Sequence, residues 1–271
     1  MSRTYPLTGV RVLEFEGIGP GPLGACMLAD FGADVVTLSR SDGKGRVRSK
    51  NDPVSRGKRS IAMNLKDPRA VALVKRIVRE VDALIEPFRP GVMERLGLGP
   101  DVLTSMNPKL IYARMTGWGQ SGDPDYVKAA GHDANYLALS GTLSLFRKAN
   151  DLTPSPPANF AGDYAGGATM LAMGVLLAYI ERQTSGKGQV IDVAMVDGAN
   201  YISLPVFKWL QMGTILREKD ERGHLDSELS ALHQAPHWCG VYECEDKEWI
   251  SVQAIEPAFY RELLKGLELD I

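Results

Sequence analysis

Three residues in the sequence can carry protons and lie in distinctive surroundings: His132, Asp163 and Glu256. His132 lies in "AGHDANYLALSG" (residues 130–141), between a glycine and an aspartate, and it is one of four histidines in 271 residues. A histidine at this place can simply start the helix that the next residues predict, or its imidazole can accept and return a proton near neutral pH. The isolated residue leaves both interpretations open.

Asp163 lies in "FAGDYAGGATM" (160–170), directly before a long apolar helical run. Aspartate is a favoured N-cap, because its carboxylate accepts the backbone N–H groups that begin a helix. The same place also suits chemistry. Gly162, Gly166 and Gly167 let a ligand approach the main chain, and free N–H groups there would stabilise a developing negative charge. Both interpretations again remain open.

Glu256 lies in "QAIEPAFY" (253–260). Proline disfavours helical geometry in the residue before it, so Pro257 predicts that Glu256 ends a strand. The preceding "VYECEDKEWISVQ" predicts a β-hairpin with "EDKE" as its turn.

The elements that must position these residues follow an alternating pattern. "GVRVLEFEG" predicts a strand, "GPGPLGACMLADFG" a turn and helix, and "DVVTLSR" the next strand. The alternation then repeats. "SIAMNL" predicts a strand, the next residues predict a helix capped by Asp67 with Pro68 in its first turn, and "DALIEPF" and "LIYARMTGWG" follow as the next segments. The order predicts an α/β fold with a Rossmann-like parallel sheet. The turn "GIGPGPLG" lacks G-x-G-x-x-G spacing, so we do not expect a nucleotide cofactor.

Basic residues follow some of these strands. Arg40 ends "DVVTLSR", Arg89 follows "DALIEPF", and "VSRGKRS" adds Arg56, Lys58 and Arg59. In an open parallel sheet, the carboxyl ends of the strands face the ligand crevice. Arg40 and Arg89 therefore suit an anionic, phosphate-bearing ligand.

Composition narrows the classes of partner. Hydrophobic residues make up 44% and charged residues 24%, which is ordinary for a globular protein, and the formal net charge is −2. No global field draws such a chain to nucleic acid or to a membrane, and we expect neither as a partner. The apolar run 168–180 is too short to span a bilayer.

The cysteines and histidines do not predict a metal site. The three cysteines are odd in number and lack zinc-ligand spacing, as do His224, His233 and His237. Reduced cysteines favour an intracellular location. We expect the cytoplasm, with peroxisome and mitochondrion left open.

Eight blocks of the sequence carry a resemblance. The chain resembles the α-methylacyl-CoA racemases of the class III CoA-transferase (CaiB/BaiF) superfamily in blocks that occur in the family's order. They are "LADFGADVV", "RGKRSIAMNLKDP", "EPFRPGVMERLGLGP", "NPKLIYARMTGWGQSG", "AGHDANYLALSG", "GDYAGGATMLAMG", "SGKGQVIDVAMVDG" and "AIEPAFY".

The resemblance implies a role for each residue that falls in a family motif. His132 and Asp163 match the two proton-transfer residues, and Glu256 matches a glutamate that assists the histidine from the partner subunit. It further implies an interlocked homodimer with its active site at the subunit interface, and no cofactor, because CoA is part of the substrate. The residues implied to line the CoA site are Arg40, Lys58, Arg59, Arg89 and Tyr136.

The resemblance also implies a division of the chain. Residues 1–200 would form the Rossmann-like CoA-binding domain, residues 201–230 a linker, and residues 231–271 the beginning of a smaller α+β domain whose remainder is absent. "LHQAPHWCG" departs from the family pattern at His233, His237 and Trp238, and we interpret these residues as packing rather than as part of the acyl pocket.

The implied activity is interconversion of (R)- and (S)-2-methylacyl-CoA thioesters by 1,1-proton transfer through an enolate. A base on one face removes the α-proton and an acid on the other returns one, and His132 with Asp163 is a suitable pair. Two alternatives remain. A CoA-transferase would use Asp163 as nucleophile, without need of His132 and Glu256. A truncated, inactive CoA-binding protein would only bind.

Overall fold

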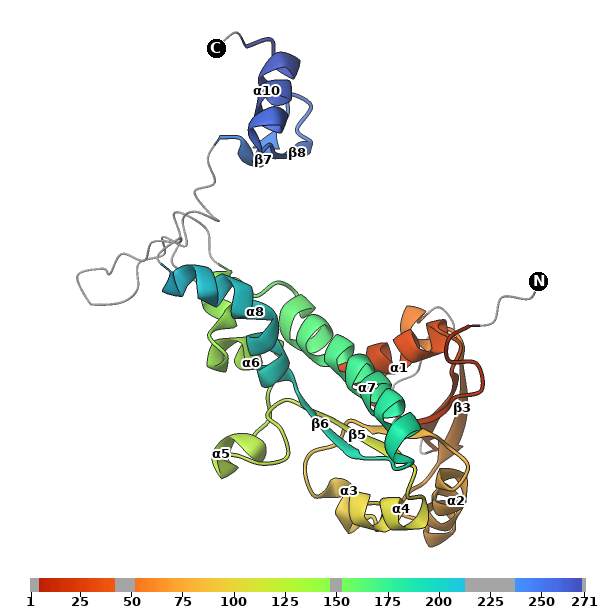
Figure 1. The fold of residues 1–271 in the computed structure, drawn as a ribbon. Coiled ribbons are helices and arrows are strands. Elements are labelled where there is room, and N and C mark those ends of the chain that lie inside the picture. The colour runs from red at the N-terminus through yellow and green to blue at the C-terminus, as the bar shows by residue number, and fades with distance from the viewer. Residues whose placement is uncertain (1–4, 42–51, 147–152, 213–236, 270–271) are drawn as a thin grey trace. The chain divides into compact units, whose positions relative to one another are not determined.

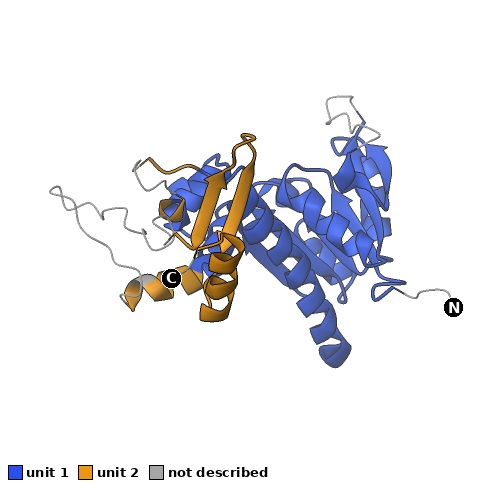
Figure 2. Cartoon of the chain, turned by 90° about the horizontal axis from the view of Figure 1, so that it is seen from above, with its two compact units in different colours: residues 1–143, 156–203 blue, residues 144–155, 204–271 orange. Residues whose placement is uncertain are grey.

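A computed structural model describes residues 5–41, 52–146, 153–212 and 237–269. The chain divides into two compact units, coloured separately in Figure 2. Unit 1 comprises residues 1–143 and 156–203, and unit 2 comprises residues 144–155 and 204–271. Each unit is described by itself.

Unit 1 contains a six-stranded sheet in the order β3-β2-β1-β4-β5-β6, and every neighbouring pair is parallel. This confirms the predicted α/β class (Figure 1). Chain order reverses between β1 and β4, which is where an open α/β sheet forms its ligand crevice. The strands are β1 (Arg11–Phe15), β2 (Asp34–Arg40), β3 (Lys58–Met63), β4 (Ala83–Glu86), β5 (Ile111–Thr116) and β6 (Val190–Ala194).

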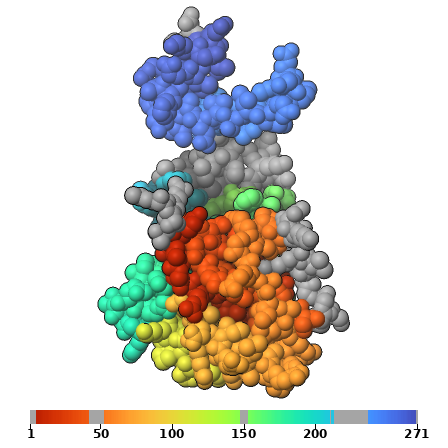
Figure 3. Space-filling view, turned by 90° about the vertical axis from the view of Figure 1, so that its right-hand side faces the viewer, coloured from red at the N-terminus to blue at the C-terminus, as the bar shows by residue number. Residues whose placement is uncertain are grey.

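Helices cover both faces of the sheet (Figure 1). One face carries α1 (Pro20–Asp30) and α7 (Met170–Ser185), and the other carries α2 (Pro68–Val78), α3 (Val92–Arg95) and α4 (Pro100–Met106). In the space-filling view, the orange surface of β3 and α2 lies beside the yellow surface near α4 (Figure 3). Further helical segments of unit 1 are η1 (Pro53–Ser55), α5 (Pro124–Val127), α6 (Asp133–Leu139), η2 (Thr142–Leu145, which extends into unit 2) and the π-helical η3 (Phe160–Thr169).

Alternate strand residues build two separate cores. Val12 and Ala113 pack with α1 and α7, whereas their neighbours Leu13 and Tyr112 pack with α2, α3 and α4. Successive side chains of a strand point to opposite faces, so a sheet covered on both sides has almost wholly apolar strands. β5 is buried along its full length.

The helix after residue 159 is longer than we expected. η3 and α7 are continuous from Phe160 to Ser185, and this 26-residue helix is the one in the described part of the chain that is long and apolar enough to cross a membrane. The apolar run 168–180, which we expected to be too short to span a bilayer, is part of this longer helix, whose first ten residues are π-helical. Leu171, Ala172 and Val175 of α7 are buried in the core with α1 and the sheet, as in the core helix of a globular protein.

The predicted linker begins inside a helix. α8 (Met195–Gln211) passes from unit 1 into unit 2, so residues 201–211 are helical rather than linker. Val206 and Phe207 pack against Leu145 and Phe146, which gives that end of α8 its own apolar contacts. Most of the remaining predicted linker lies outside the described residues.

Unit 2 contains the predicted hairpin. β7 (Cys239–Glu243) and β8 (Trp249–Gln253) are antiparallel, and α10 (Pro257–Gly266) follows. The backbone N–H of Cys244 donates to Glu248 O at 2.8 Å, which closes the "EDKE" turn as predicted. Lys247 in that turn has φ 72°, a left-handed conformation.

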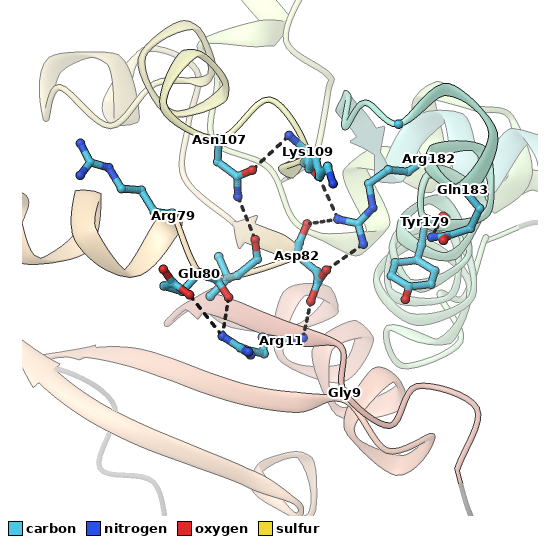
Figure 4. Close-up of a pocket in the computed structure, with 12 residues that line it drawn as sticks. Gly9, Arg11, Arg79, Glu80, Asp82, Asn107, Lys109, Tyr179, Arg182 and Gln183 are labelled. Atoms are coloured by element: carbon cyan, nitrogen blue, oxygen red, sulfur yellow. Dashed lines mark hydrogen bonds and ion pairs between the residues drawn. The ribbon is translucent and has the colours of Figure 1, made fainter.

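The amino-terminal edge of the sheet of unit 1 is held by one arginine (Figure 4). Arg182, near the end of α7, donates to Asp82 Oδ1 at 2.7 Å and to Lys109 O at 2.9 Å. Asp82 Oδ2 accepts the backbone N–H of Arg11 at 2.8 Å. These bonds join α7 to the starts of β1, β4 and β5. These residues line a shallow pocket of about 440 Å³ at this edge of the sheet.

We expect Arg182→Ala to lower the free energy of unfolding by about 1.5–3 kcal/mol, because Asp82 loses its charged donor and α7 loses its bonds to the starts of β4 and β5. The Arg182 side chain is only 9% exposed. Urea denaturation measures the loss. Arg69→Ala is the control, since its ion pair with Asp67 is open to solvent and should have no measurable effect. Equal losses in both variants would contradict this role of Arg182.

Candidate active site

A pocket of about 520 Å³ lies at the carboxyl edge of β1, β4 and β5, where chain order reverses. Its walls come from the loops after those strands, the start of α6 and the start of η3. All of them belong to unit 1. The lining residues are Ile18, Gly19, Pro20, Pro87, Phe88, Arg89, Pro90, Met115, Thr116, Gly117, Trp118, Val127, Ala129, Ala130, Gly131, His132, Tyr136, Asn159, Asp163, Tyr164 and Met195.

His132 is the N-cap residue of α6, and its side chain lines this pocket. Its backbone is extended, and its N–H donates to Asn135 Oδ1 at 3.0 Å. The backbone of His132 thus starts the helix, and the residue is exposed and lines the pocket. The two interpretations drawn from the sequence are therefore compatible.

Tyr136, one turn along α6, forms part of the same wall. Its hydroxyl donates to Gly131 O at 2.5 Å, and its ring packs edge-on against Trp118 with centroids 4.7 Å apart. Burial raises the pKa of the phenol to about 12, and the nearby charge of Asp163 adds to the shift. Tyr136 therefore contributes a neutral phenol to the wall of the pocket.

Asp163 is not an N-cap. It is the fourth residue of η3, and Asn159, in a left-handed conformation, holds the cap position. Asn159 Nδ2 donates to Asp163 Oδ2 at 2.8 Å. Gly19 (φ 65°) also comes close, because a Cβ there would lie 3.2 Å from Asp163 Oδ2. The carboxylate thus faces the pocket instead of the helix backbone.

The surroundings of Asp163 shift the pKa of its carboxyl upward. Burial raises the pKa of this carboxyl above its ordinary value, and the like charge of Asp133 adds to the increase. The hydrogen bond from Asn159 and the charge of His132 oppose the shift. A carboxyl with a raised pKa is a stronger base when ionised, which suits proton transfer.

The predicted anion-stabilising N–H groups at the start of the Asp163 helix are already engaged. Asp133 Oδ1 accepts the N–H of Gly162 at 2.8 Å and that of Asp163 at 2.7 Å. A carboxylate from α6 therefore occupies the place that the sequence suggested for a ligand oxygen. Asp133 was not singled out from the sequence, although it directly follows His132.

Arg89 reaches the pocket on a loop that a buried ion pair supports. Glu86, the last residue of β4, accepts the N–H of Phe88 at 2.8 Å and Nε of Arg114 at 2.9 Å. Burial raises the pKa of Glu86, while the Phe88 N–H and Arg114 oppose the shift. Arg114 also pairs with Glu94 at 2.8 Å. In the sequence, the only sign of this ion pair is Glu86 in "EPFRPG", because its partner Arg114 lies 28 residues away.

The other predicted CoA-site cations lie outside this pocket. Lys58 Nζ pairs with Glu14 at 2.9 Å, and the Lys58 side chain is 1% exposed. Arg59 forms an exposed ion pair with Asp34 at 2.6 Å. Arg40 ends β2 at the carboxyl edge of the sheet, where its N–H donates to Glu16 Oε2 at 3.2 Å. The structure therefore brings together His132, Asp163, Arg89 and Tyr136 but not these three.

Glu256 belongs to unit 2, where it is exposed at the N-cap position of α10. Nearby, His237 Nε2 lies 2.9 Å from the Tyr260 hydroxyl, and Trp238 packs on both rings. This cluster agrees with packing for His237 and Trp238. His224 and His233 lie outside the described residues. In the described ranges, no three metal-ligating side chains gather.

Comparison with known proteins gives a consistent set of relatives. The sequence model of CoA-transferase family III matches residues 7–270. The chain is 46% identical over 264 residues to alpha-methylacyl-CoA racemase of Mus musculus and 44% identical over 263 residues to that of Homo sapiens. Each alignment covers 97% of this chain and 65% of the relative, so the chain spans about two-thirds of the length of these curated relatives.

A solved structure agrees with these relatives. The crystal structure of Rv3272 from M. tuberculosis matches with a TM-score of 0.73 at 28% identity, covering 98% of this chain and 69% of that one.

The raised pKa of Asp163 predicts a gain in stability on neutralisation. Such a carboxyl binds its proton more tightly in the folded state, so its ionisation destabilises the fold above the folded pKa. The effect disappears below the unfolded pKa, about 3.9. Asp163→Asn should therefore raise the Tm at pH 7.5, and the gain should vanish as the pH approaches 4. Scanning calorimetry measures both.

Asp101→Asn is the control for this experiment, because Asp101 is exposed in the first turn of α4. It should give no gain at either pH, since an acid near a helix start is mildly stabilising. An unchanged or lower Tm for Asp163→Asn at pH 7.5 would contradict the raised pKa.

Proposed function

The chain belongs to CoA-transferase family III, and from this premise we propose that it is an isomerase that interconverts (R)- and (S)-2-methylacyl-CoA thioesters. One observation carries the proposal: a single pocket is lined by both an imidazole, from His132, and a carboxyl of raised pKa, from Asp163. The identity of 44–46% to proteins named alpha-methylacyl-CoA racemase supports it.

The proposed reaction is a 1,1-proton transfer. One of the two groups removes the α-proton, and the electron pair of the broken C–H bond moves to the thioester oxygen to form an enolate. The other group then delivers a proton to the opposite face of the α-carbon, which gives the epimer. His132 and Asp163 exchange protonation states in each turnover, so one acts as base for the (R) form and the other for the (S) form.

No further group is needed for this sequence of steps, because the thioester itself accepts the electron pair. We therefore propose that the reaction requires no metal or organic cofactor, with CoA entering as part of the substrate. The matched strengths of the two bases matter here, since each must both remove and return a proton.

The CoA part is proposed to bind along the same edge of the sheet. Arg89 lines the pocket and carries a charge suited to a phosphate, while Tyr136 lines the wall beside it. Arg40 ends a strand at the same edge and is proposed as an outer contact. Lys58 and Arg59 are engaged with Glu14 and Asp34, which makes support of the sheet their simpler role.

We further propose a homodimer in which Glu256 of the partner subunit assists His132. The exposed position of Glu256 at the start of α10 leaves its carboxylate accessible for such a contact. A cytoplasmic location is proposed as well, consistent with three free cysteines.

The first test is exchange of the α-proton of each enantiomer of a 2-methylacyl-CoA in deuterated water. His132→Ala should block exchange from one enantiomer more than from the other, and Asp163→Ala should show the opposite bias, because each group faces one side of the α-carbon. Mass spectrometry of the recovered thioester measures the label.

The same assay separates the alternatives. Equal, modest losses for both enantiomers in both variants would contradict the two-base assignment. CoA transfer to an added carboxylic acid without α-exchange would indicate a transferase with Asp163 as nucleophile. Binding without either reaction would indicate a protein that only holds acyl-CoA.

The second test concerns the ligand. Arg89→Ala should weaken acyl-CoA binding by roughly 10- to 150-fold, because a charge-assisted contact to phosphate is lost. Isothermal calorimetry measures the affinity, and Arg69→Ala, an exposed arginine on α2, serves as control. An unchanged affinity of Arg89→Ala for acyl-CoA would contradict a contact between Arg89 and a phosphate of CoA.

A further inference from the structure

Asp133 is a buried carboxylate at the junction of α6 and η3. It is the first residue of α6, it is 3% exposed, and it adjoins His132 in the chain. Its Oδ1 accepts two backbone N–H groups, those of Gly162 and Asp163, at 2.8 and 2.7 Å. Its Oδ2 is buried and has no hydrogen-bond partner among the described residues. Burying a carboxylate with one unpartnered oxygen costs free energy, so the position of Asp133 needs an explanation.

The reason lies in the geometry of η3. In a π-helix each N–H bonds to the carbonyl five residues earlier, as Tyr164 N–H does to Asn159 O at 3.2 Å. Gly162 and Asp163 precede Tyr164, so their N–H groups have no acceptor inside the helix. Asn159, at the N-cap position, does not cap them, because its side chain donates to Asp163 Oδ2. Asp133 therefore caps η3 from another helix.

Gly162 makes this contact possible. A Cβ on Gly162 would lie 2.6 Å from Asp133 Oδ1 and 3.1 Å from its Cγ, closer than packed atoms tolerate. The absence of a side chain at Gly162 thus lets the carboxylate reach both N–H groups.

We infer that Asp133 is a positioning residue, which fixes the Asp163 main chain against the start of α6 and so sets the placement of Asp163 relative to His132. This role rests on the proposed function. Because Asp133 follows His132 directly and binds the N–H of Asp163 itself, any shift of η3 relative to α6 must stretch these two bonds. A small misplacement of two proton-transfer groups is enough to slow a reaction greatly.

Asp133 also acts on Asp163 through its charge, and the two effects can be separated. The charge of Asp133 adds to the raised pKa of Asp163. Asparagine at residue 133 would keep an oxygen that accepts both N–H groups but would remove the charge. Alanine would remove both. The other titratable groups that line the pocket with Asp163 are His132, Tyr136, Tyr164 and Arg89, and they are the same in all these variants.

The first readout is independent of activity. Amide hydrogen exchange by mass spectrometry, on peptides that cover residues 160–166, reports on the two N–H groups. Asp133→Ala should speed exchange at Gly162 and Asp163 roughly tenfold or more, and Asp133→Asn should leave it near the wild-type rate. Asp67→Ala is the matched control, since Asp67 caps α2 locally by accepting the N–H of Arg69 at 2.9 Å. It should not affect residues 160–166.

The second readout is racemisation of a 2-methylacyl-CoA. Asp133→Ala should lower kcat roughly 100-fold while KM stays within about threefold, because binding groups such as Arg89 are untouched. Asp133→Asn should keep most of kcat but move the acid limb of its pH profile to lower pH, because loss of the like charge lowers the pKa of Asp163. Gly162→Ala, which pushes the carboxylate away from the other side, should reproduce Asp133→Ala and replaces it if that variant does not fold.

The outcomes are distinct. Wild-type amide exchange at Gly162 and Asp163 in both Asp133→Ala and Gly162→Ala would overturn the inference. So would faster exchange with unchanged kcat, which would leave Asp133 a structural cap only. If the wild-type chain itself does not racemise the thioester, the proposed function fails, and amide exchange still decides whether Asp133 holds η3.

Discussion

The site depends on one buried carboxylate bonded to two backbone N–H groups. Asp133 on α6 and the N–H of Asp163 on η3 are 30 residues apart in the chain, and this contact brings them together. The contact fixes the main chain at both proposed proton-transfer residues. His132 directly precedes Asp133 at the start of α6, and Asp163 lies in the turn of η3 that Asp133 caps. The same carboxylate accepts the N–H groups of Gly162 and Asp163, which the sequence suggested as donors to a ligand anion.

The parallel sheet separates structural and chemical roles between its two edges. At the amino edge, Arg182 and Asp82 tie α7 to the strand starts through groups that satisfy one another. At the carboxyl edge, the loops after β1, β4 and β5 leave a pocket where chain order reverses. Helix starts and strand ends leave polar main-chain groups at this edge, and this is why ligand sites in open α/β sheets gather there.

The sequence predicted the elements better than the contacts between them. Alternating strands and helices predicted the parallel sheet, and motif blocks identified His132, Asp163, Arg89 and Tyr136, which share one pocket. Lys58 and Arg59 were assigned from their neighbours in the chain, but Glu14 and Asp34, on β1 and β2, engage them. Such pairing depends on strand order and on which face a side chain occupies, and neither is local.

Asp133 and Glu86 escaped sequence reasoning for the same reason. Each is an ordinary acid beside a motif residue, and each acquires its role only from a partner 28 to 30 residues away. The sequence predicted a helix directly after Asp163 but not the π-helical winding of Phe160–Thr169, which begins before it.

The central claim is that an acyl-CoA places its α-carbon between His132 and Asp163 in the pocket of unit 1. A crystal structure of the chain with a bound 2-methylacyl-CoA tests this most directly. We expect the α-carbon within about 3–3.5 Å of both the imidazole and the carboxylate, which would lie on its opposite faces. An acyl group bound away from this pocket, or a covalent bond between the acyl carbon and Asp163, would contradict it.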